Sequence, residues 1–230
     1  MGLYSKAVSY LMGDRGLLLE FGDTISREIN EKVRRMVLAI QAESIEGIVE
    51  TVPTYRSLLI LYDPMILSVE GLRGKLFQIE EGLQQTPLPE PRLTRIPVTY
   101  GGAYGPDLEE VARVHQISPK EVVQLHCGTP YLIYMIGFMP GYPYMGELPQ
   151  ALVTPRLKTP RLSVPKGSVA IAQRQTGIYS MKSPGGWQIL GRTPVELFDP
   201  RKDPPALLQM GDFVQFYPID EKEFKDWRTD

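Results

Sequence analysis

Cysteine and histidine are nearly absent from this 230-residue chain. Cys127 is the single cysteine, which excludes a disulfide within the chain, and only His115 and His126 accompany it, too few for a multi-ligand zinc pattern. No apolar run approaches the roughly 20 residues that span a bilayer, and the first residues lack the apolar stretch of a signal peptide. We therefore expect a reducing, cytoplasmic setting, no metal site and no membrane partner.

An excess of one charge and the common catalytic motifs are also missing. The 25 lysines and arginines nearly balance the 27 acids and form no lysine-rich run, which argues against nucleic acid as the main partner. The chain has neither a G-x-x-x-x-G-K-S/T loop nor a G-x-G-x-x-G turn between a strand and a helix, so any nucleotide site is unconventional. The absence of a G-x-S-x-G elbow, of amidase lysine and serine spacing and of a biotin-attachment sequence argues against a self-contained hydrolase triad.

Two apolar periodicities alternate over the first hundred residues. They predict, in order, a hairpin with a buried second arm at 17–21, a helix over 29–40, strands at 48–52 and 57–62, a helix over 69–83 and a final strand at 93–99. Asp23 or Thr24 is available to cap the first helix. This order predicts a compact α+β domain with both helices on one face of an antiparallel sheet.

The pattern changes after residue 102. Asp107 is expected to cap a short helix, and Ser118 with Glu121 has the form of a capping box that starts a second short helix ending near His126. We expect these two helices to bridge the halves of the chain. Beyond them, β-rich runs separated by turn signals predict an all-β sandwich or barrel, with strands at 131–137, 168–172, 187–190, 196–198 and 213–217.

Glycine and proline crowd into residues 137–194, which hold eight of the 21 glycines and eight of the 21 prolines. Proline fixes the backbone angle φ, whereas glycine allows values that other residues avoid. Loops rich in both residues are typical of a binding or catalytic site. The phrase GFMPGYPYMGELP follows an apolar strand, so that Phe138 and Tyr144 either stack on a ligand or plug the core at a tight corner. The phrase SPGGW, from Ser183 to Trp187, either presents backbone N–H groups to an anion or is a turn before a strand.

The charge of this region is lopsided. Residues 130–195 contain one acid, Glu147, and seven basic residues, namely Arg156, Lys158, Arg161, Lys166, Arg174, Lys182 and Arg192. Each cation taken singly is as compatible with a solvated rim as with a site. Because the imbalance is collective, it favours a shared site for a carboxylate or phosphate.

His126 and Cys127 lie together at the end of the second short helix. By position alone a structural role for His126 is favoured, because a helix C-terminus stabilises a charged imidazole. Cys127 is interpreted as an inert small residue, since nothing in the sequence gives it a cationic neighbour.

Five phrases, in order, carry a resemblance to a known family: IPVTYGGAYGPDLEEVA, SPKEVVQLH, YMIGFMPGYPYMGELP, TPRLSVPKGSVAIAQRQTGIY and SPGGWQILGRTPVELFDP. Together they resemble the allophanate hydrolase subunit 1 family, which includes the B-type subunit of 5-oxoprolinase and the KipI-type inhibitor of a sporulation histidine kinase. The resemblance covers nearly the whole chain. It implies an N-terminal ferredoxin-like α+β domain over 1–92 and a cyclophilin-like β-barrel over 93–230, with the short bridging helices near 107–126.

The resemblance implies two functions. The first is the non-autonomous B-type subunit of an ATP-dependent 5-oxoprolinase, in which a homologous barrel protein of type C and a separate protein of type A are needed to open 5-oxo-L-proline to L-glutamate. ATP, with Mg²⁺, is then a co-substrate, and no tightly bound cofactor is expected. The alternative is a regulatory protein that inhibits a histidine kinase. A similar pair of domains occurs in urea carboxylase.

The family's recurrent phrases also imply site residues. His126 is expected as a proton donor or acceptor, and Lys166, with Arg161, as a cation that holds phosphate or carboxylate. The residues expected to bind substrate or ATP are Phe138, Pro140, Gly141, Tyr144, Arg161, Gln175, Ser183, Gly185, Trp187 and Arg192.

Overall fold

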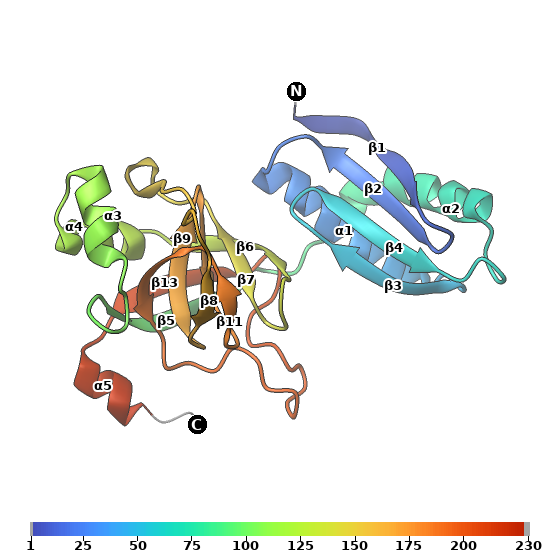
Figure 1. The fold of residues 1–230 in the computed structure, drawn as a ribbon. Helices are drawn as coiled ribbons and strands as arrows, with labels where there is room; N and C mark the ends of the chain where they lie inside the picture. Colours follow the sequence, from blue (N-terminus) through green and yellow to red (C-terminus); the bar gives the residue numbers. More distant parts are fainter. Residues whose placement is uncertain (1, 228–230) are drawn as a thin grey trace. The chain divides into compact units, whose positions relative to one another are not determined.

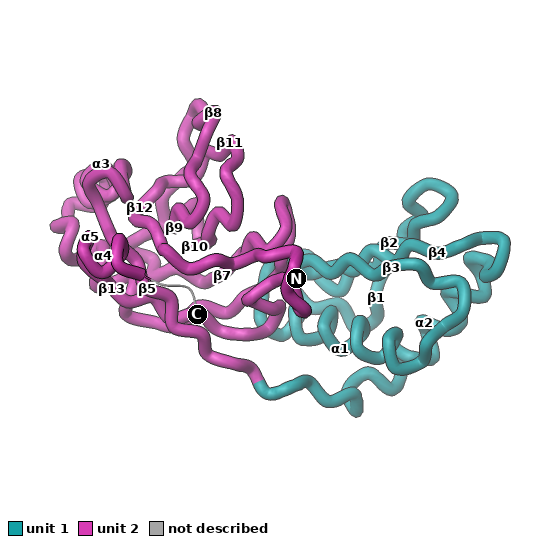
Figure 2. Tube along the Cα trace, turned by 90° about the horizontal axis from the view of Figure 1, so that it is seen from below, with its two compact units in different colours: residues 1–90 teal, residues 91–230 magenta. Residues whose placement is uncertain are grey.

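The computed structural model describes residues 2–227. The chain divides into two compact units, residues 1–90 and 91–230, which Figure 2 shows in separate colours. Within the described residues, no helix is both long and apolar enough to cross a membrane. The protein is thus a mixed α+β chain, and each unit has its own architecture.

The first unit is a four-stranded antiparallel sheet with two helices on one face (Figure 1). The strand order is β1-β2-β4-β3. Its elements are β1 (Leu3–Met12), β2 (Gly16–Gly22), α1 (Arg27–Glu43), β3 (Ile48–Pro53), β4 (Ser57–Tyr62), α2 (Val69–Gly82) and the 3-10 turn η1 (Leu83–Gln85). The predicted hairpin, strands and helices are confirmed, with ends shifted by a few residues.

The buried arm of the hairpin faces α1. Leu17 and Phe21 of β2 are completely buried, as are Val33 and Met36 of α1. Each such side chain stabilises the fold by about 1.5–3 kcal/mol relative to an exposed position. The alternation in β2 and the helical spacing in α1 therefore meet in one core.

The cap of α1 differs from the prediction. Ser26 is the N-cap, and its hydroxyl accepts a hydrogen bond of 3.2 Å from the Ile29 N–H group. Asp23 and Thr24, predicted as caps, precede the helix by too many residues to reach its free N–H groups. The apolar spacing located the helix but not its first turn.

Replacing Ser26 with alanine should destabilise the first turn of α1 by about 1 kcal/mol, because one backbone donor loses its acceptor. Faster amide hydrogen exchange at Ile29 and Asn30 would report the loss. Thr24→Ala is the matched control, since Thr24 is exposed and outside the helix. Equal exchange in the two variants would show that Ser26 does not act as the cap.

The second unit is built on a closed seven-stranded barrel, with strand order β10-β7-β6-β13-β5-β12-β9. A two-stranded ribbon, β8 with β11, extends from it, and Figure 2 shows these two strands side by side. The elements are β5 (Leu93–Tyr100), α3 (Leu108–His115), α4 (Pro119–Cys127), β6 (Tyr131–Ile136), β7 (Pro143–Gly146), the 3-10 turn η2 (Gln150–Leu152), β8 (Arg161–Val164), β9 (Ser168–Ala172), β10 (Gln175–Ile178), β11 (Ser183–Gly185), β12 (Gln188–Arg192), β13 (Phe213–Pro218) and α5 (Glu221–Asp226).

Strand β5 corrects one prediction. The sequence pattern assigns this strand to the N-terminal sheet, whereas it pairs in parallel with β13 and antiparallel with β12 in the barrel. Strands β7, β8, β10 and β11 lie outside the predicted runs, and residues 196–198 form only an isolated bridge between Phe198 and Ala206. Pairing across more than a hundred residues, as between β5 and β13, leaves no local signal in the sequence.

Strand β9 separates two apolar clusters. Val169 and Ile171 point into the barrel core, whereas Ala170 and Ala172 belong to a second cluster with Trp187. Both faces are buried, which explains why this strand reads as a continuous apolar run. The second cluster forms the floor of the candidate site.

Helices α3 and α4 belong to the second unit and pack on the barrel core through residues such as Val111 and Val122. The capping box of Ser118 and Glu121 is confirmed. Asp107 precedes α3, but its carboxylate makes no capping bond. It accepts hydrogen bonds from the Arg161 guanidinium at 2.5 Å and from the Ile189 N–H group at 2.6 Å.

Candidate functional site

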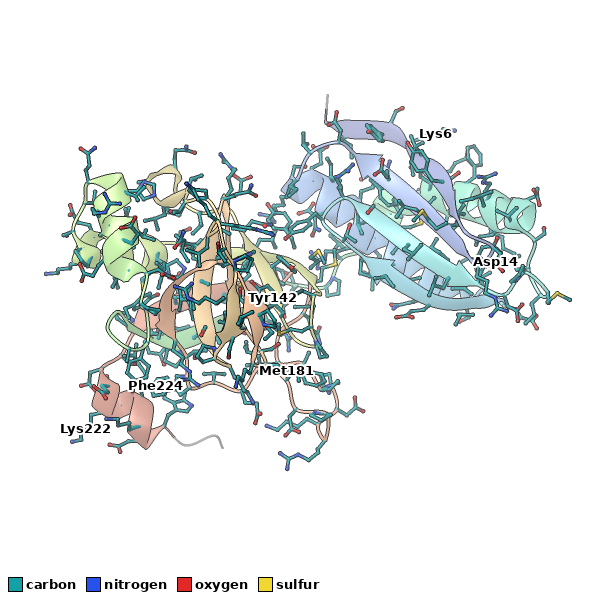
Figure 3. The ribbon with its side chains drawn as sticks, viewed as in Figure 1. Lys6, Asp14, Tyr142, Met181, Lys222 and Phe224 are labelled. Atoms are coloured by element: carbon teal, nitrogen blue, oxygen red, sulfur yellow. The ribbon has the colours of Figure 1, made fainter. Side chains whose placement is uncertain are left out.

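An aromatic pocket of about 330 Å³ lies over the second apolar cluster of the barrel unit. Five rings line it, from Phe138, Tyr142, Tyr144, Tyr179 and Trp187. The other lining residues are Arg156, Pro160, Pro184, Gly185 and Gly186. Figure 3 labels Tyr142, which lies beside the barrel strands. We call this cavity the aromatic pocket.

The rings of the aromatic pocket hold one another in place. Tyr142 is central, with its ring edge-on to Trp187 at 5.9 Å and to Tyr179 at 5.3 Å between centroids. Tyr144 contacts Trp187 at 5.8 Å. Such edge-to-face pairs stabilise by about 0.5–1.5 kcal/mol each beyond the area they bury. The pocket is therefore a preformed apolar surface.

Backbone geometry brings Phe138 to the rim of this pocket. Phe138 adopts a left-handed conformation with φ of 66°, and Gly141 has φ of 73°. Together they close a tight turn in which the Gly137 N–H group bonds to the Tyr142 carbonyl at 3.1 Å. The Phe138 ring is 64% exposed and lies edge-on to Tyr142. An exposed ring beside a cavity is suited to contact a ligand.

Glycine is required where the opposite wall passes Tyr179. A Cβ atom on Gly185 would lie 2.3 Å from the Tyr179 hydroxyl oxygen. Burial raises the pKa of Tyr179, and a hydrogen bond from the Trp187 backbone opposes this rise. Tyr179 is therefore a neutral, hydrogen-bonding wall of the pocket.

Arg156 is the single charged residue among the ten that line the pocket. Its guanidinium lies over the Trp187 ring, 5.8 Å from the centroid. Burial raises the pKa of Tyr144, and the positive charge of Arg156 opposes this rise. The pocket thus combines aromatic faces with one cation.

The structure brings together four of the residues expected in the site: Phe138, Tyr144, Gly185 and Trp187. Pro140 and Gly141 lie in the Phe138 turn without lining the pocket, and the Pro140 carbonyl accepts a hydrogen bond of 2.6 Å from Ser180. The Ser183 hydroxyl bonds to the adjacent Pro184 carbonyl at 3.0 Å.

Three of the cations expected to share an anion site have other partners. Arg161 pairs with Asp107, and Lys166 pairs with Glu196 at 2.5 Å on the surface. The Arg192 guanidinium donates to the Lys166 carbonyl at 2.7 Å. Because Asp107 and Glu196 lie outside the window in which charges were counted, the imbalance in that window overstated the free positive charge.

His126 lies in the barrel interior, where its side chain is completely buried. Its Nδ1 atom is 2.8 Å from the Tyr100 hydroxyl, and its Nε2 atom is 2.9 Å from the Thr176 hydroxyl. The ring stacks on Phe216 with centroids 4.6 Å apart. Burial lowers the pKa of His126 to about 3, so the imidazole is neutral. It does not line the aromatic pocket.

Gln175 is also separate from the pocket. It lies in β10 opposite Gly146 and Ala172, and its buried side-chain nitrogen has no hydrogen-bond partner among residues 2–227. Within that same range, no three His, Cys, Asp or Glu side chains gather as metal ligands would.

The residues that the sequence interpretation left out of the site are Tyr142, Arg156, Pro160, Tyr179, Pro184 and Gly186. Tyr142 lies in the phrase GFMPGYPYMGELP and Gly186 in the phrase SPGGW. Because other residues of both phrases were predicted in the site, their position in the sequence could have identified these two. Arg156 carried no distinguishing signal, because it is one of seven cations in that region and only its place in the pocket lining sets it apart.

Comparison with known proteins places this chain in a family. A family model described as the carboxyltransferase domain, subdomain C and D, matches residues 8–208. The chain belongs to this carboxyltransferase C/D family. The resemblance seen in the five sequence phrases is confirmed, since relatives over nearly the full length are named as the B-type subunit of 5-oxoprolinase.

Two such relatives of the carboxyltransferase C/D family are bacterial. This chain is 37% identical over 233 residues to the B-type 5-oxoprolinase subunit of Bacillus subtilis (strain 168), covering 95% of each chain. It is 40% identical over 219 residues to the B-type 5-oxoprolinase subunit of Escherichia coli O157:H7, covering 94% of this chain and 98% of the relative. The crystal structure of TTHA0988 is 38% identical with a TM-score of 0.79, covering 90% of this chain but 40% of that chain.

Proposed function

We propose that this chain is the B-type subunit of an ATP-dependent 5-oxoprolinase. Two relatives with that name match at 37% and 40% identity, each over nearly its full length. The name of a subunit points to an assembly, and we assign the partners as a homologous barrel protein of type C and a separate protein of type A. The complex would open 5-oxo-L-proline with water to L-glutamate while ATP is hydrolysed to ADP and phosphate.

The finer fold assignment is part of this proposal. A sheet of four antiparallel strands under two helices supports a ferredoxin-like domain over 1–92. A closed barrel of seven strands supports a cyclophilin-like domain over 93–230.

Within the proposed complex, this chain supplies binding rather than proton transfer. The ten residues of the aromatic pocket include no carboxylate and no imidazole. His126 finds no support as the proton donor or acceptor, because it is neutral and its side chain is completely buried. Opening a lactam needs activation of an unreactive carbonyl, which phosphorylation by ATP would supply. The groups that move protons would then come from the other proteins of the complex.

Reconstitution tests the function directly. Release of glutamate and ADP from 5-oxoproline and ATP should occur only when this chain is combined with the A-type and C-type proteins, because the pocket of this chain contains no carboxylate and no imidazole. A B-type protein already active with the same two preparations serves as the positive control. Turnover by that control but not by this chain would overturn the proposal and favour the histidine-kinase inhibitor.

A further inference from the structure

Arg156 is the cation that lines the aromatic pocket, and unlike three other cations of the barrel unit it has no acidic partner within residues 2–227. Its side chain is exposed, and no carboxylate within residues 2–227 pairs with it. By contrast, Arg161, Lys166 and Arg174 each contact a carboxylate at 2.5 Å. An unpaired guanidinium beside an apolar cavity is available to bind a ligand anion.

The backbone on both sides of Arg156 is hydrogen-bonded to the two residues that flank Trp187. The Pro155 carbonyl accepts a hydrogen bond of 3.1 Å from the Gln188 side chain. The Leu157 N–H group donates to the Gly186 carbonyl at 2.7 Å. Because these bonds flank Arg156 directly, its Cα position relative to the aromatic pocket is set before any ligand arrives.

We propose that the aromatic pocket binds the substrate itself, a small cyclic amide that carries one carboxylate, and that Arg156 binds this carboxylate. The inference rests on the proposed function. The flat lactam ring would lie against Trp187 and Tyr144, and its carboxylate would extend to the guanidinium. Arg156 is therefore assigned as a specificity residue for 5-oxoproline.

Size and charge favour the substrate over the nucleotide as the occupant. The cavity of about 330 Å³ is at the low end for small-molecule sites, which span about 300–1,000 Å³. A nucleoside triphosphate carries several negative charges, whereas a single cation lines this pocket. One guanidinium matches one carboxylate, and the apolar rings match the ring carbons.

The experiment combines one change in the protein with one change in the ligand. In the reconstituted complex, Arg156→Gln should raise KM for 5-oxoproline at least about tenfold and leave KM for ATP within about twofold, since only the carboxylate loses a charged partner. Arg156→Lys should give an intermediate KM, because lysine keeps the charge without the planar fork. Arg174→Gln is the control, since Arg174 pairs with Glu147 on the surface and does not line the pocket.

The ligand change uses 2-pyrrolidinone, which has the lactam ring but no carboxylate. With the unaltered complex, its inhibition constant should exceed KM for 5-oxoproline at least about tenfold. In the Arg156→Gln complex the two constants should be nearly equal, because loss of the guanidinium and loss of the carboxylate remove the same contact. An active complex in which Arg156→Gln changes only KM for ATP, or in which 2-pyrrolidinone binds as well as 5-oxoproline, overturns the inference alone. A complex that shows no turnover overturns the proposed function and the inference together.

Discussion

Asp107→Ala is expected to lower the free energy of unfolding of the barrel unit by about 2–4 kcal/mol. The Asp107 carboxylate is largely buried and accepts hydrogen bonds from both Arg161 and the Ile189 N–H group. Its removal leaves a mostly buried guanidinium without its partner and a buried N–H group without an acceptor. Urea unfolding followed by tryptophan fluorescence measures the change, because both tryptophans, Trp187 and Trp227, belong to the second unit.

Glu147→Ala is the matched control for this effect. Glu147 forms an equally short contact with Arg174, at 2.5 Å, but both side chains are about half exposed. Surface pairs of this kind contribute about 0–1 kcal/mol, so this variant should unfold close to the unaltered protein. If the two variants lost equal stability, the bonds of Asp107 would have no special role.

Asp107 also connects stability to the site. The Arg161 guanidinium that it binds also donates to the Trp187 carbonyl at 3.4 Å, so Asp107 fixes one wall of the aromatic pocket through Arg161. The sequence suggested other roles for both residues, Asp107 as a helix cap and Arg161 as an anion ligand. Neither interpretation included this contact, because the two residues are 54 positions apart and the sequence does not show that they contact each other.

The parts of the fold that sequence predicted are those with a local cause. The alternation in β2 and the spacing in α1 follow from burial on one face of one element, and the capping box at Ser118 is complete within four residues. Strand β11 has no such signal, since Ser-Pro-Gly forms a strand only by pairing with β8. Membership of β5 in the barrel likewise depends on β13, which lies more than a hundred residues away.

In the candidate site too, the residues that the sequence predicted are those with a local signal. Gly185 and Phe138 stand in phrases whose backbone requirements are visible in the sequence, and both line the pocket. The choice among cations depends instead on which acids lie nearby in space. The sequence indicated Lys166 as an anion ligand, but Lys166 pairs with Glu196 in the structure. Arg156 had no such signal, yet it lines the pocket and has no acidic partner within residues 2–227.

Acid should destabilise the barrel unit through His126. The hydrogen bonds of its surroundings assign the neutral form: the Thr176 hydroxyl donates to the Ala170 carbonyl, so it accepts from His126 Nε2, which leaves Nδ1 to accept from Tyr100. The other titratable groups that face the ring, Tyr100, Cys127 and Tyr131, have pKa values raised by burial and carry no negative charge to offset a proton. A charged imidazole therefore has no counterion here.

The pH dependence follows from the direction of this shift. The pKa of His126 falls from an ordinary 6.5 to about 3 on folding, so its contribution to stability is complete above pH 6.5 and decreases as pH falls toward 3. Between pH 7 and pH 4.5 the unaltered barrel unit should lose about 3 kcal/mol more than His126→Gln, which cannot take up this proton. Urea unfolding at a series of pH values, followed by tryptophan fluorescence, measures the difference.

A second measurement needs no variant. In the folded protein, NMR signals of the His126 ring should show no titration from pH 7 to pH 4.5, because protonation would break the bond from Tyr100 to Nδ1 within a completely buried ring. A midpoint near pH 6 would show that the ring accepts a proton without loss of the fold. It would also restore His126 as a candidate for proton transfer. Because the ring is neutral and buried, the proposed function otherwise leaves proton transfer to the other proteins of the complex.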